Sequence, residues 1–185
     1  ETHSALTQIA LVGTCVPREC GIATFTSDLR SALFREAKGT LCSTVAVTDS
    51  GSYAYPDFVP LEIDATRPAS YAVAADFLNV SDVDVVSLQH EFGIFGGEAG
   101  SHILELLRRI RAPVVTTLHT VLATPDDAQR RVMDEIIMRS ARLVVMAERG
   151  QRILQDIYGV PPERISLVPH GTPDRAFIDP AMPKH

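Results

Sequence analysis

Short apolar runs alternate along this chain with segments in which apolar residues recur every three or four positions. The runs predict strands at residues 8–12, 41–48, 59–63, 83–90, 113–119, 142–147 and 164–169. The recurring positions predict helices at 24–38 and 69–78, and three more around 103–110, 132–137 and 153–157. Residues 124–127 predict the start of the fourth helix, with the Thr124 hydroxyl as its cap and Pro125 at the first helical position. Single helices between β-branched runs are typical of βαβ units, so we expect an α/β fold with a parallel sheet.

Three of the six histidines stand at the ends of predicted strands, at His90, His119 and His170. The carboxyl ends of parallel strands meet at one edge of a sheet, where open α/β folds bind their ligands. A single strand-end histidine is commonly structural, but three in the same position predict a site assembled from several strands. A histidine there can exchange hydrogen bonds with a phosphate or a sugar hydroxyl near neutral pH.

The loop between the first strand and the first helix, residues 13–24, begins and ends with turn-forming residues. Free N–H groups at a helix start suit a phosphate or a sugar hydroxyl. The loop has neither the Gly-Lys-Ser/Thr ending of a P-loop nor the GxGxxG pattern of a dinucleotide site. A plain structural turn is therefore the alternative interpretation.

The segment from His90 to Glu98 combines a polar pair, two phenylalanines and several glycines. Such a loop can close over a ligand and exclude water. Alternatively, Phe92 and Phe95 anchor the loop in the core. Neighbours on a strand point to opposite faces, so we do not expect His90 and Glu91 to form an acid–base pair.

Composition narrows the class of protein. The 185 residues, 45% of them hydrophobic, suit one domain, and a net charge of −6 argues against nucleic acid as a partner. Arginine clusters at 108–111 and 129–131 predict solvated helix faces, with contact to anionic lipid or to an acidic partner as the alternative. The three cysteines lack metal-ligand spacing, and a site built from His90 and His119 lacks a third ligand, so we expect reduced thiols and no metal. No signal peptide or transmembrane run is evident, which predicts a cytoplasmic protein.

Four segments together resemble the N-terminal domain of a retaining glycosyltransferase of the GT-B fold, in glycosyltransferase family 4. They are residues 17–25, the strand ending at His90 with its glycine-rich loop, residues 113–120 and residues 158–171. The resemblance extends from about Ile9 to Pro180. In the last segment His170 stands where the family commonly has Asn, whereas Phe177 and Pro180 keep the later pattern.

The resemblance implies two Rossmann-like domains, each a doubly wound parallel sheet with helices on both faces, that face one another across a cleft. By position, it places His119 beside the transferred sugar as the catalytic candidate. It assigns His170 and Gly171 to the hinge. The remaining candidates, for binding acceptor or donor, are Gly21, Ile22, Ala23, His90, Glu91, Phe92, Gly93, Gly96, Gly97 and Thr120.

The family pattern also predicts the domain organisation and the reaction. We expect an acceptor-side domain at 1–171 and the start of an interdomain linker at 172–185. The donor-binding C-terminal domain, with its Glu-x7-Glu motif, is missing, and the first loop lacks the Gly-Gly pair of many relatives. The implied parent transfers a mannosyl- or glucosyl-type unit from a nucleotide-sugar, with retention and without a metal ion. The implied acceptor is a saccharide, a lipid or a small molecule.

The expected partners are the nucleotide-sugar, the acceptor and the chain's own C-terminal domain, with peripheral membrane contact as a further expectation. We expect the isolated domain to be inactive. Two other functions stay open, of which the first is a non-catalytic module that binds sugar or nucleotide. The second is a GT-B-like hydrolase or epimerase, which needs a carboxylate pair, and Glu91 and Glu98 are the local candidates.

Overall fold

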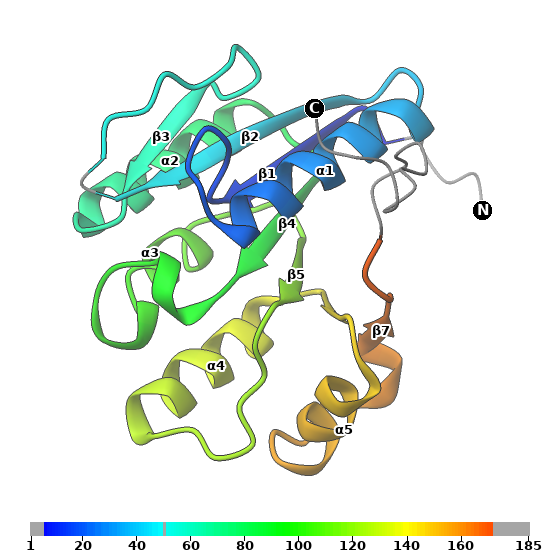
Figure 1. Ribbon diagram of the computed structural model, residues 1–185. Helices are drawn as coiled ribbons and strands as arrows, with labels where there is room; N and C mark the ends of the chain where they lie inside the picture. The colour runs from blue at the N-terminus through cyan, green and yellow to red at the C-terminus, as the bar shows by residue number, and fades with distance from the viewer. Residues whose placement is uncertain (1–5, 50, 172–185) are drawn as a thin grey trace, which may run out of the picture.

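The computed structural model describes residues 6–49 and 51–171 and contains one parallel sheet (Figure 1). Its order is β3-β2-β1-β4-β5-β6-β7, and every neighbouring pair is parallel. The strands are β1 (Gln8–Gly13), β2 (Leu41–Thr48), β3 (Leu61–Asp64), β4 (Val85–His90), β5 (Val114–Leu118), β6 (Arg142–Val145) and β7 (Ile165–Leu167). The predicted α/β fold with a parallel sheet is confirmed.

Helices connect most consecutive strands. The α-helices are α1 (Gly21–Glu36), α2 (Pro68–Val80), α3 (Ile103–Leu107), α4 (Asp127–Arg139) and α5 (Glu148–Asp156). Three short 3-10 turns are η1 (Phe92–Ile94), η2 (Glu98–Gly100) and η3 (Pro162–Arg164). From β1 the chain moves outward through β2 to β3, and then returns to β4 on the other side of β1. This reversal makes the carboxyl ends of β1 and β4 the topological switch point, where such sheets bind ligands.

Alternate residues of the strands pack against different helices. Ile9 and Leu11 of β1 face α1, where Leu29 and Leu33 cover them. Ala10 and Val12 face the larger core, to which α2, α3, α4 and α5 contribute. Figure 1 shows α1 and α2 on opposite sides of the sheet. The sheet is thus doubly wound with helices on both faces, as predicted, and side chains at the end of a strand reach one side or the other according to parity.

Two helix starts differ from the predictions because the capping side chains differ. α1 begins at Gly21 rather than near Thr24, since the Cys20 sulfur accepts a hydrogen bond from the Ala23 N–H at 3.3 Å. α4 begins at Asp127 because Asp126, not Thr124, is the cap. Asp126 and Gln129 exchange side-chain and backbone bonds in a capping box.

Most other boundaries shift by one to three residues, and α5 begins at Glu148, five residues before the predicted segment. α3 ends at Leu107 rather than near Ile110, because the backbone N–H groups of Arg109 and Ile110 both turn to the Leu106 carbonyl. β7 ends at Leu167, so His170 follows the strand rather than ending it. The predicted linker at 172–185, with Phe177 and Pro180, lies outside the described residues.

Candidate functional site

His119 and His170, two of the three histidines that were predicted at strand ends, come together on the α1 side of the sheet. His119 directly follows β5, and its backbone N–H donates to the His90 carbonyl at 3.0 Å. Phe25 of α1 meets the His119 ring edge-on, with centroids 4.8 Å apart, and meets the His170 ring at 5.9 Å. Phe25 thus lies between the loop after β5 and the segment after β7.

The environment of His119 keeps its imidazole neutral. Burial lowers the pKa of the ring, nearby Glu91 opposes this shift, and His170 adds to it. The ring is nevertheless partly exposed. Its Nε2 atom lies 3.1 Å from Oε1 of Gln89, a side chain that is completely buried at the end of β4. A neutral and oriented imidazole at this edge can exchange hydrogen bonds with a ligand without carrying charge.

Glu91 and Thr120 join the loops that follow β4 and β5. One carboxylate oxygen of Glu91 accepts a hydrogen bond from the Thr120 hydroxyl, and the other accepts the Phe92 N–H at 2.9 Å. Both side chains are partly buried. Glu91 therefore bonds Thr120 rather than His90, as the alternation of a strand predicts. The pair holds a negative charge close to His119.

His90 points to the opposite side of the sheet, into the larger core. Its imidazole is completely buried, stacked on Phe95 at 5.8 Å and edge-on to Phe92 at 5.0 Å. Neither ring nitrogen has a hydrogen-bond partner within the described residues. Burial, and to a lesser extent His119, lowers the pKa of this ring to about 3, so it is neutral. Because His90 is completely buried, it can affect an acceptor pocket only by positioning Phe92 and Phe95, against which it packs.

The glycine-rich loop after β4 packs tightly against the end of β3. Phe95 is 5% exposed, as expected for an anchor in the core. The Gly96 N–H donates to the Tyr71 hydroxyl at 3.3 Å, and a Cβ atom at Gly96 would lie 1.9 Å from the Ala65 carbonyl oxygen. Gly97 has a φ of +82°. Gly93, in contrast, has open space around it. Closure of this loop over a ligand stays a prediction.

The predicted phosphate-binding turn forms the first turn of α1. Gly21 is exposed, Ile22 packs against the core and Ala23 is buried. No acidic residue lies in this turn, so the positive end of the helix dipole is not neutralised there. In the preceding loop, Arg18 forms an ion pair with Asp49 at 3.2 Å. This arrangement is compatible with an anionic ligand, and binding itself stays a prediction.

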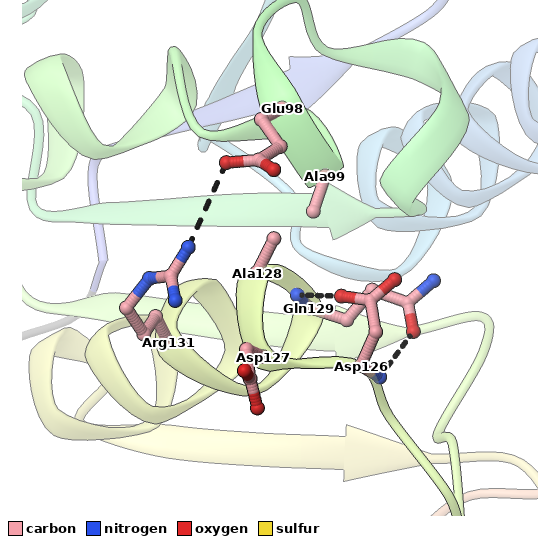
Figure 2. A pocket seen from close by; sticks show the side chains of 7 residues that line it. All are labelled: Glu98, Ala99, Asp126, Asp127, Ala128, Gln129 and Arg131. Carbon is pink, nitrogen blue, oxygen red and sulfur yellow. Dashed lines mark hydrogen bonds and ion pairs between the residues drawn. The ribbon is translucent and has the colours of Figure 1, made fainter.

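The two glutamates required by a hydrolase lie in different environments. Glu98 is 78% exposed and pairs with Arg131 of α4 at 3.6 Å, whereas Glu91 bonds Thr120. Glu98 borders an open pocket of about 500 Å³ beside the start of α4 (Figure 2). Its lining residues are Glu98, Ala99, Asp126, Asp127, Ala128, Gln129 and Arg131. The polar groups of Asp126 and Gln129 are engaged in the capping box.

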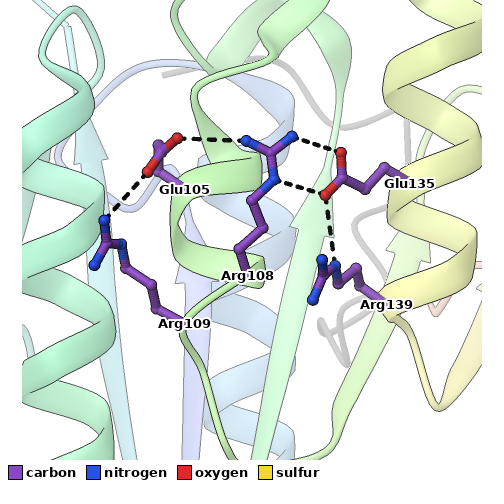
Figure 3. Close-up of polar contacts among 5 residues, drawn as sticks. All are labelled: Glu105, Arg108, Arg109, Glu135 and Arg139. Atoms are coloured by element: carbon purple, nitrogen blue, oxygen red, sulfur yellow. Dashed lines mark hydrogen bonds and ion pairs between the residues drawn. The ribbon is translucent and has the colours of Figure 1, made fainter.

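Much of the arginine cluster at 108–111 is neutralised by neighbouring acids. Arg108 bonds both oxygens of Glu135 at 2.7 Å and also contacts Glu105, while Arg109 and Arg139 flank the same two acids (Figure 3). Gln129 belongs to the capping box, and Arg130 pairs with Asp134 at 2.9 Å. These contacts fit the predicted solvated faces. Peripheral membrane contact stays a prediction.

Two further observations concern metals and membranes. Within the described part of the chain, no group of three or more His, Cys, Asp or Glu side chains gathers as a metal site would require. Among the helices of residues 6–49 and 51–171, none is both long and apolar enough to span a bilayer.

The sequence reasoning missed Gln89 and Phe25 as site residues. Both signals were present: Gln89 interrupts an apolar run one position before His90, and Phe25 lies in the helix start that follows the first loop. Four of the predicted residues lie near one another on the α1 side of the sheet: His119, Glu91, Thr120 and His170. Gly171 directly follows His170 and is exposed.

Comparisons with known proteins agree with this architecture. The family model of Glycosyltransferase Family 4 matches residues 24–175. The apo lipopolysaccharide outer core galactosyltransferase WaaB aligns over 93% of this chain and 48% of its own, with 13% identity and a TM-score of 0.63. The α-glucosyltransferase AGT in complex with UDP aligns over 86% and 40%, with 16% identity and a TM-score of 0.55.

A glycosyltransferase from Rickettsia africae aligns over 89% of this chain and 43% of its own, with 13% identity and a TM-score of 0.53. No functionally curated protein sequence matches the chain. At these identities the solved structures show a shared GT-B-type fold. The chain spans less than half the length of each of these structures.

Proposed function

This chain belongs to glycosyltransferase family 4, and from this premise we propose that it is the acceptor-binding half of a retaining glycosyltransferase. The whole enzyme transfers a hexosyl unit, of mannosyl or glucosyl type, from a nucleotide-sugar to a saccharide, lipid or small-molecule acceptor. Residues 1–171 form one wall of the active site. A second Rossmann-like domain, entered through a linker that starts near Thr172, supplies the donor-binding wall.

The arrangement of His119 is the observation that carries this proposal. A neutral, partly exposed imidazole beside the switch point of a doubly wound sheet, at the end of β5, suits the recognition of a sugar hydroxyl. One solved neighbour is described as an α-glucosyltransferase with UDP-glucose and another as a galactosyltransferase, which supports a hexosyl donor. We assign His119 to the transferred sugar, with His170 and Gly171 at the hinge.

In the proposed reaction this half orients the reactants. Transfer with retention requires stabilisation of the leaving diphosphate, and in this proposal the donor-binding domain supplies most of the charge for it. In this proposal the first turn of α1, which carries no acidic residue, directs the positive end of its dipole to the donor phosphates or the acceptor. The contact between Glu91 and Thr120 ties the loop after β4 to the loop that begins with His119, and in this proposal it keeps the acceptor hydroxyl in position. We propose that the reaction proceeds without a metal ion.

The acceptor side of the proposal rests on the loop after β4. Phe92, Gly93, Gly96 and Gly97 border the edge of the sheet next to Glu91. A saccharide or lipid acceptor fits a family whose solved neighbours include an enzyme named for lipopolysaccharide. For a lipid acceptor the enzyme works at the membrane surface, in the cytoplasm.

The decisive experiment measures hexosyl transfer by the full-length parent. His119→Ala should lower kcat/KM by about tenfold to a hundredfold, with only a modest fall in melting temperature because the buried amide oxygen of Gln89 loses its partner. Met138→Ala, at a surface residue that is 67% exposed on α4, is the matched control and should leave both unchanged. Wild-type kinetics in His119→Ala would remove this residue from the mechanism.

A second measurement tests whether transfer requires both the acceptor-binding domain and the proposed donor-binding domain. The purified 185-residue chain should fold but show little or no transfer with any nucleotide-sugar. Robust turnover by this chain alone would contradict the assignment to one half of the active site.

A further inference from the structure

The side chain of Gln89 makes two hydrogen bonds on the α1 side of β4. Its Oε1 atom lies 3.1 Å from Nε2 of His119, and its Nε2 atom donates to the Ser87 hydroxyl at 3.1 Å. Gln89 is completely buried, and Ser87 lies two residues before it on the same face of the strand. The amide is therefore held at both ends.

This geometry determines which nitrogen of His119 carries the proton. A carbonyl oxygen can only accept a hydrogen bond, so Nε2 of His119 must be the donor. In a neutral imidazole the other nitrogen, Nδ1, then keeps its lone pair. Among the described residues, no other group hydrogen-bonds this ring through its side-chain atoms.

The neighbouring strand β1 leaves room for the Gln89 side chain, because it ends in a glycine. Gly13 ends β1 beside Gln89, and a Cβ atom at Gly13 would lie 2.9 Å from the Cβ atom of Gln89. Phe25 packs edge-on against the imidazole from α1. The amide of Gln89 and the ring of Phe25 thus restrict the orientation of the imidazole from two directions.

We infer that Gln89 is a positioning residue that holds His119 as the Nε2–H tautomer, so that Nδ1 accepts a hydrogen bond from a hydroxyl of the sugar substrate. The tautomer follows from the orientation of the Gln89 amide, whose oxygen faces the ring, and only the identity of the hydroxyl donor rests on the proposed function. Because Nδ1 of His119 can only accept a hydrogen bond in this tautomer, its ligand group must be a hydrogen-bond donor. A sugar hydroxyl satisfies this requirement, whereas a phosphate oxygen without a proton does not.

The first test is direct observation of the tautomer by ¹H–¹⁵N NMR of the histidine rings in the 185-residue chain. The wild type should show His119 protonated on Nε2 alone. Gln89→Leu should give a mixture of both tautomers, since the acceptor is lost. Thr117→Val, at the buried position paired with Gln89 on β5, is the matched control and should keep the wild-type tautomer.

Two further variants keep the test valid if Gln89→Leu does not fold. Gln89→Glu retains an acceptor but adds negative charge, so it should keep the Nε2–H tautomer and raise the pKa of His119 by about one unit. Ser87→Ala frees the amide to rotate and should partly populate the Nδ1–H form. A wild-type ring protonated on Nδ1, or variants with an unchanged ring, would overturn the inference.

Kinetics of the full-length parent separate this inference from the proposed function. Gln89→Leu should lower kcat/KM by about tenfold, because the substrate loses a properly oriented acceptor. An altered tautomer with wild-type turnover would overturn the role of Gln89 in substrate recognition. If His119→Ala also leaves turnover unchanged, the role of His119 in the proposed function fails, even though the NMR result for the tautomer stands.

Discussion

The hydroxyl of Thr120 donates a hydrogen bond to the carboxylate of Glu91, and this contact joins the loops after β4 and β5. The two residues are 29 positions apart in the chain. Because Glu91 also accepts the Phe92 N–H, it fixes the start of the glycine-rich loop. The contact thus relates the position of His119, next to Thr120, to the position of the predicted acceptor loop.

Thr120→Val should therefore loosen both loops. The change keeps the shape of the side chain but leaves one oxygen of a partly buried carboxylate without its partner. We expect the free energy of unfolding to fall by about 1 to 2 kcal/mol, measured by urea denaturation of the 185-residue chain. Thr120→Ser keeps the hydroxyl and should retain most of the stability. Equal losses in both variants would show that the methyl group, rather than the hydrogen bond, matters.

The glycine-rich loop offers a matched pair of substitutions. A Cβ atom at Gly96 would lie 1.9 Å from the Ala65 carbonyl oxygen and 2.6 Å from Nδ1 of His102, and the backbone oxygen cannot move cheaply. Gly96→Ala should destabilise the chain by about 1 to 3 kcal/mol. Gly93→Ala meets nothing within 4 Å and should change stability by less than about 0.5 kcal/mol.

The same pair distinguishes structure from function in the full-length parent. If Gly93 borders the acceptor, Gly93→Ala should raise the KM for acceptor while the melting temperature stays constant. A stable Gly96→Ala variant would contradict the close packing of this loop on the end of β3.

The order of strands and helices could be predicted from sequence because each element carries its own periodicity. β2 has the predicted bounds, residues 41–48, and the other strands differ by at most three residues at either end. Caps were harder to predict. Thr124 has the common capping side chain, but Asp126 forms the capping box with Gln129. Cys20, which is rarely considered a cap, starts α1 three residues early.

From the sequence, the site could be predicted only for those features that depend on a single strand, such as which neighbouring side chains face opposite sides. Alternation indicates that Gln89 and His90 face opposite sides, but not which side α1 covers. The side that α1 covers depends on the strand order, in which the chain returns from β3 to place β4 next to β1. His90, the more conspicuous residue, enters the core, whereas Gln89 reaches His119 from 30 positions away in the sequence. Contacts at such separations arise from the strand order and leave no local pattern.

The buried imidazole of His90 predicts a pH dependence of stability. Its pKa is about 3 in the folded chain and about 6.5 when exposed, so the unfolded chain binds more protons between these values. The stability associated with the neutral ring is fully present above pH 6.5 and is lost as the pH falls towards 3. The slope should approach about 1.4 kcal/mol per pH unit in the middle of this window.

His90→Phe is the variant that isolates this effect. It keeps an aromatic ring between Phe92 and Phe95 and removes two polar atoms that have no partner within the described residues. Unfolding free energies measured from pH 7 to pH 4.5 should fall less steeply in the variant, and at pH 7 the variant should be more stable by about 1 kcal/mol. Parallel curves for both proteins would contradict a neutral, buried His90.

The three cysteines should react with a thiol reagent at very different rates. Cys15 and Cys42 are buried, and burial raises the pKa of both thiols, which lowers the fraction of reactive thiolate. Cys20 is partly exposed at the start of α1. Native protein should therefore show one fast-reacting thiol, and Cys20→Ser should abolish the fast phase.

Cys20 also stabilises α1, because its side chain caps the start of the helix. Cys20→Ala removes the acceptor of the Ala23 N–H and should cost about 1 kcal/mol of unfolding free energy, whereas Cys20→Ser, with a better capping atom, should cost less. In the full-length parent, a bound nucleotide-sugar should slow labelling of Cys20, because the first turn of α1 is expected to approach the donor phosphates or the acceptor. Labelling at the same rate with saturating ligand would place the bound ligand away from α1.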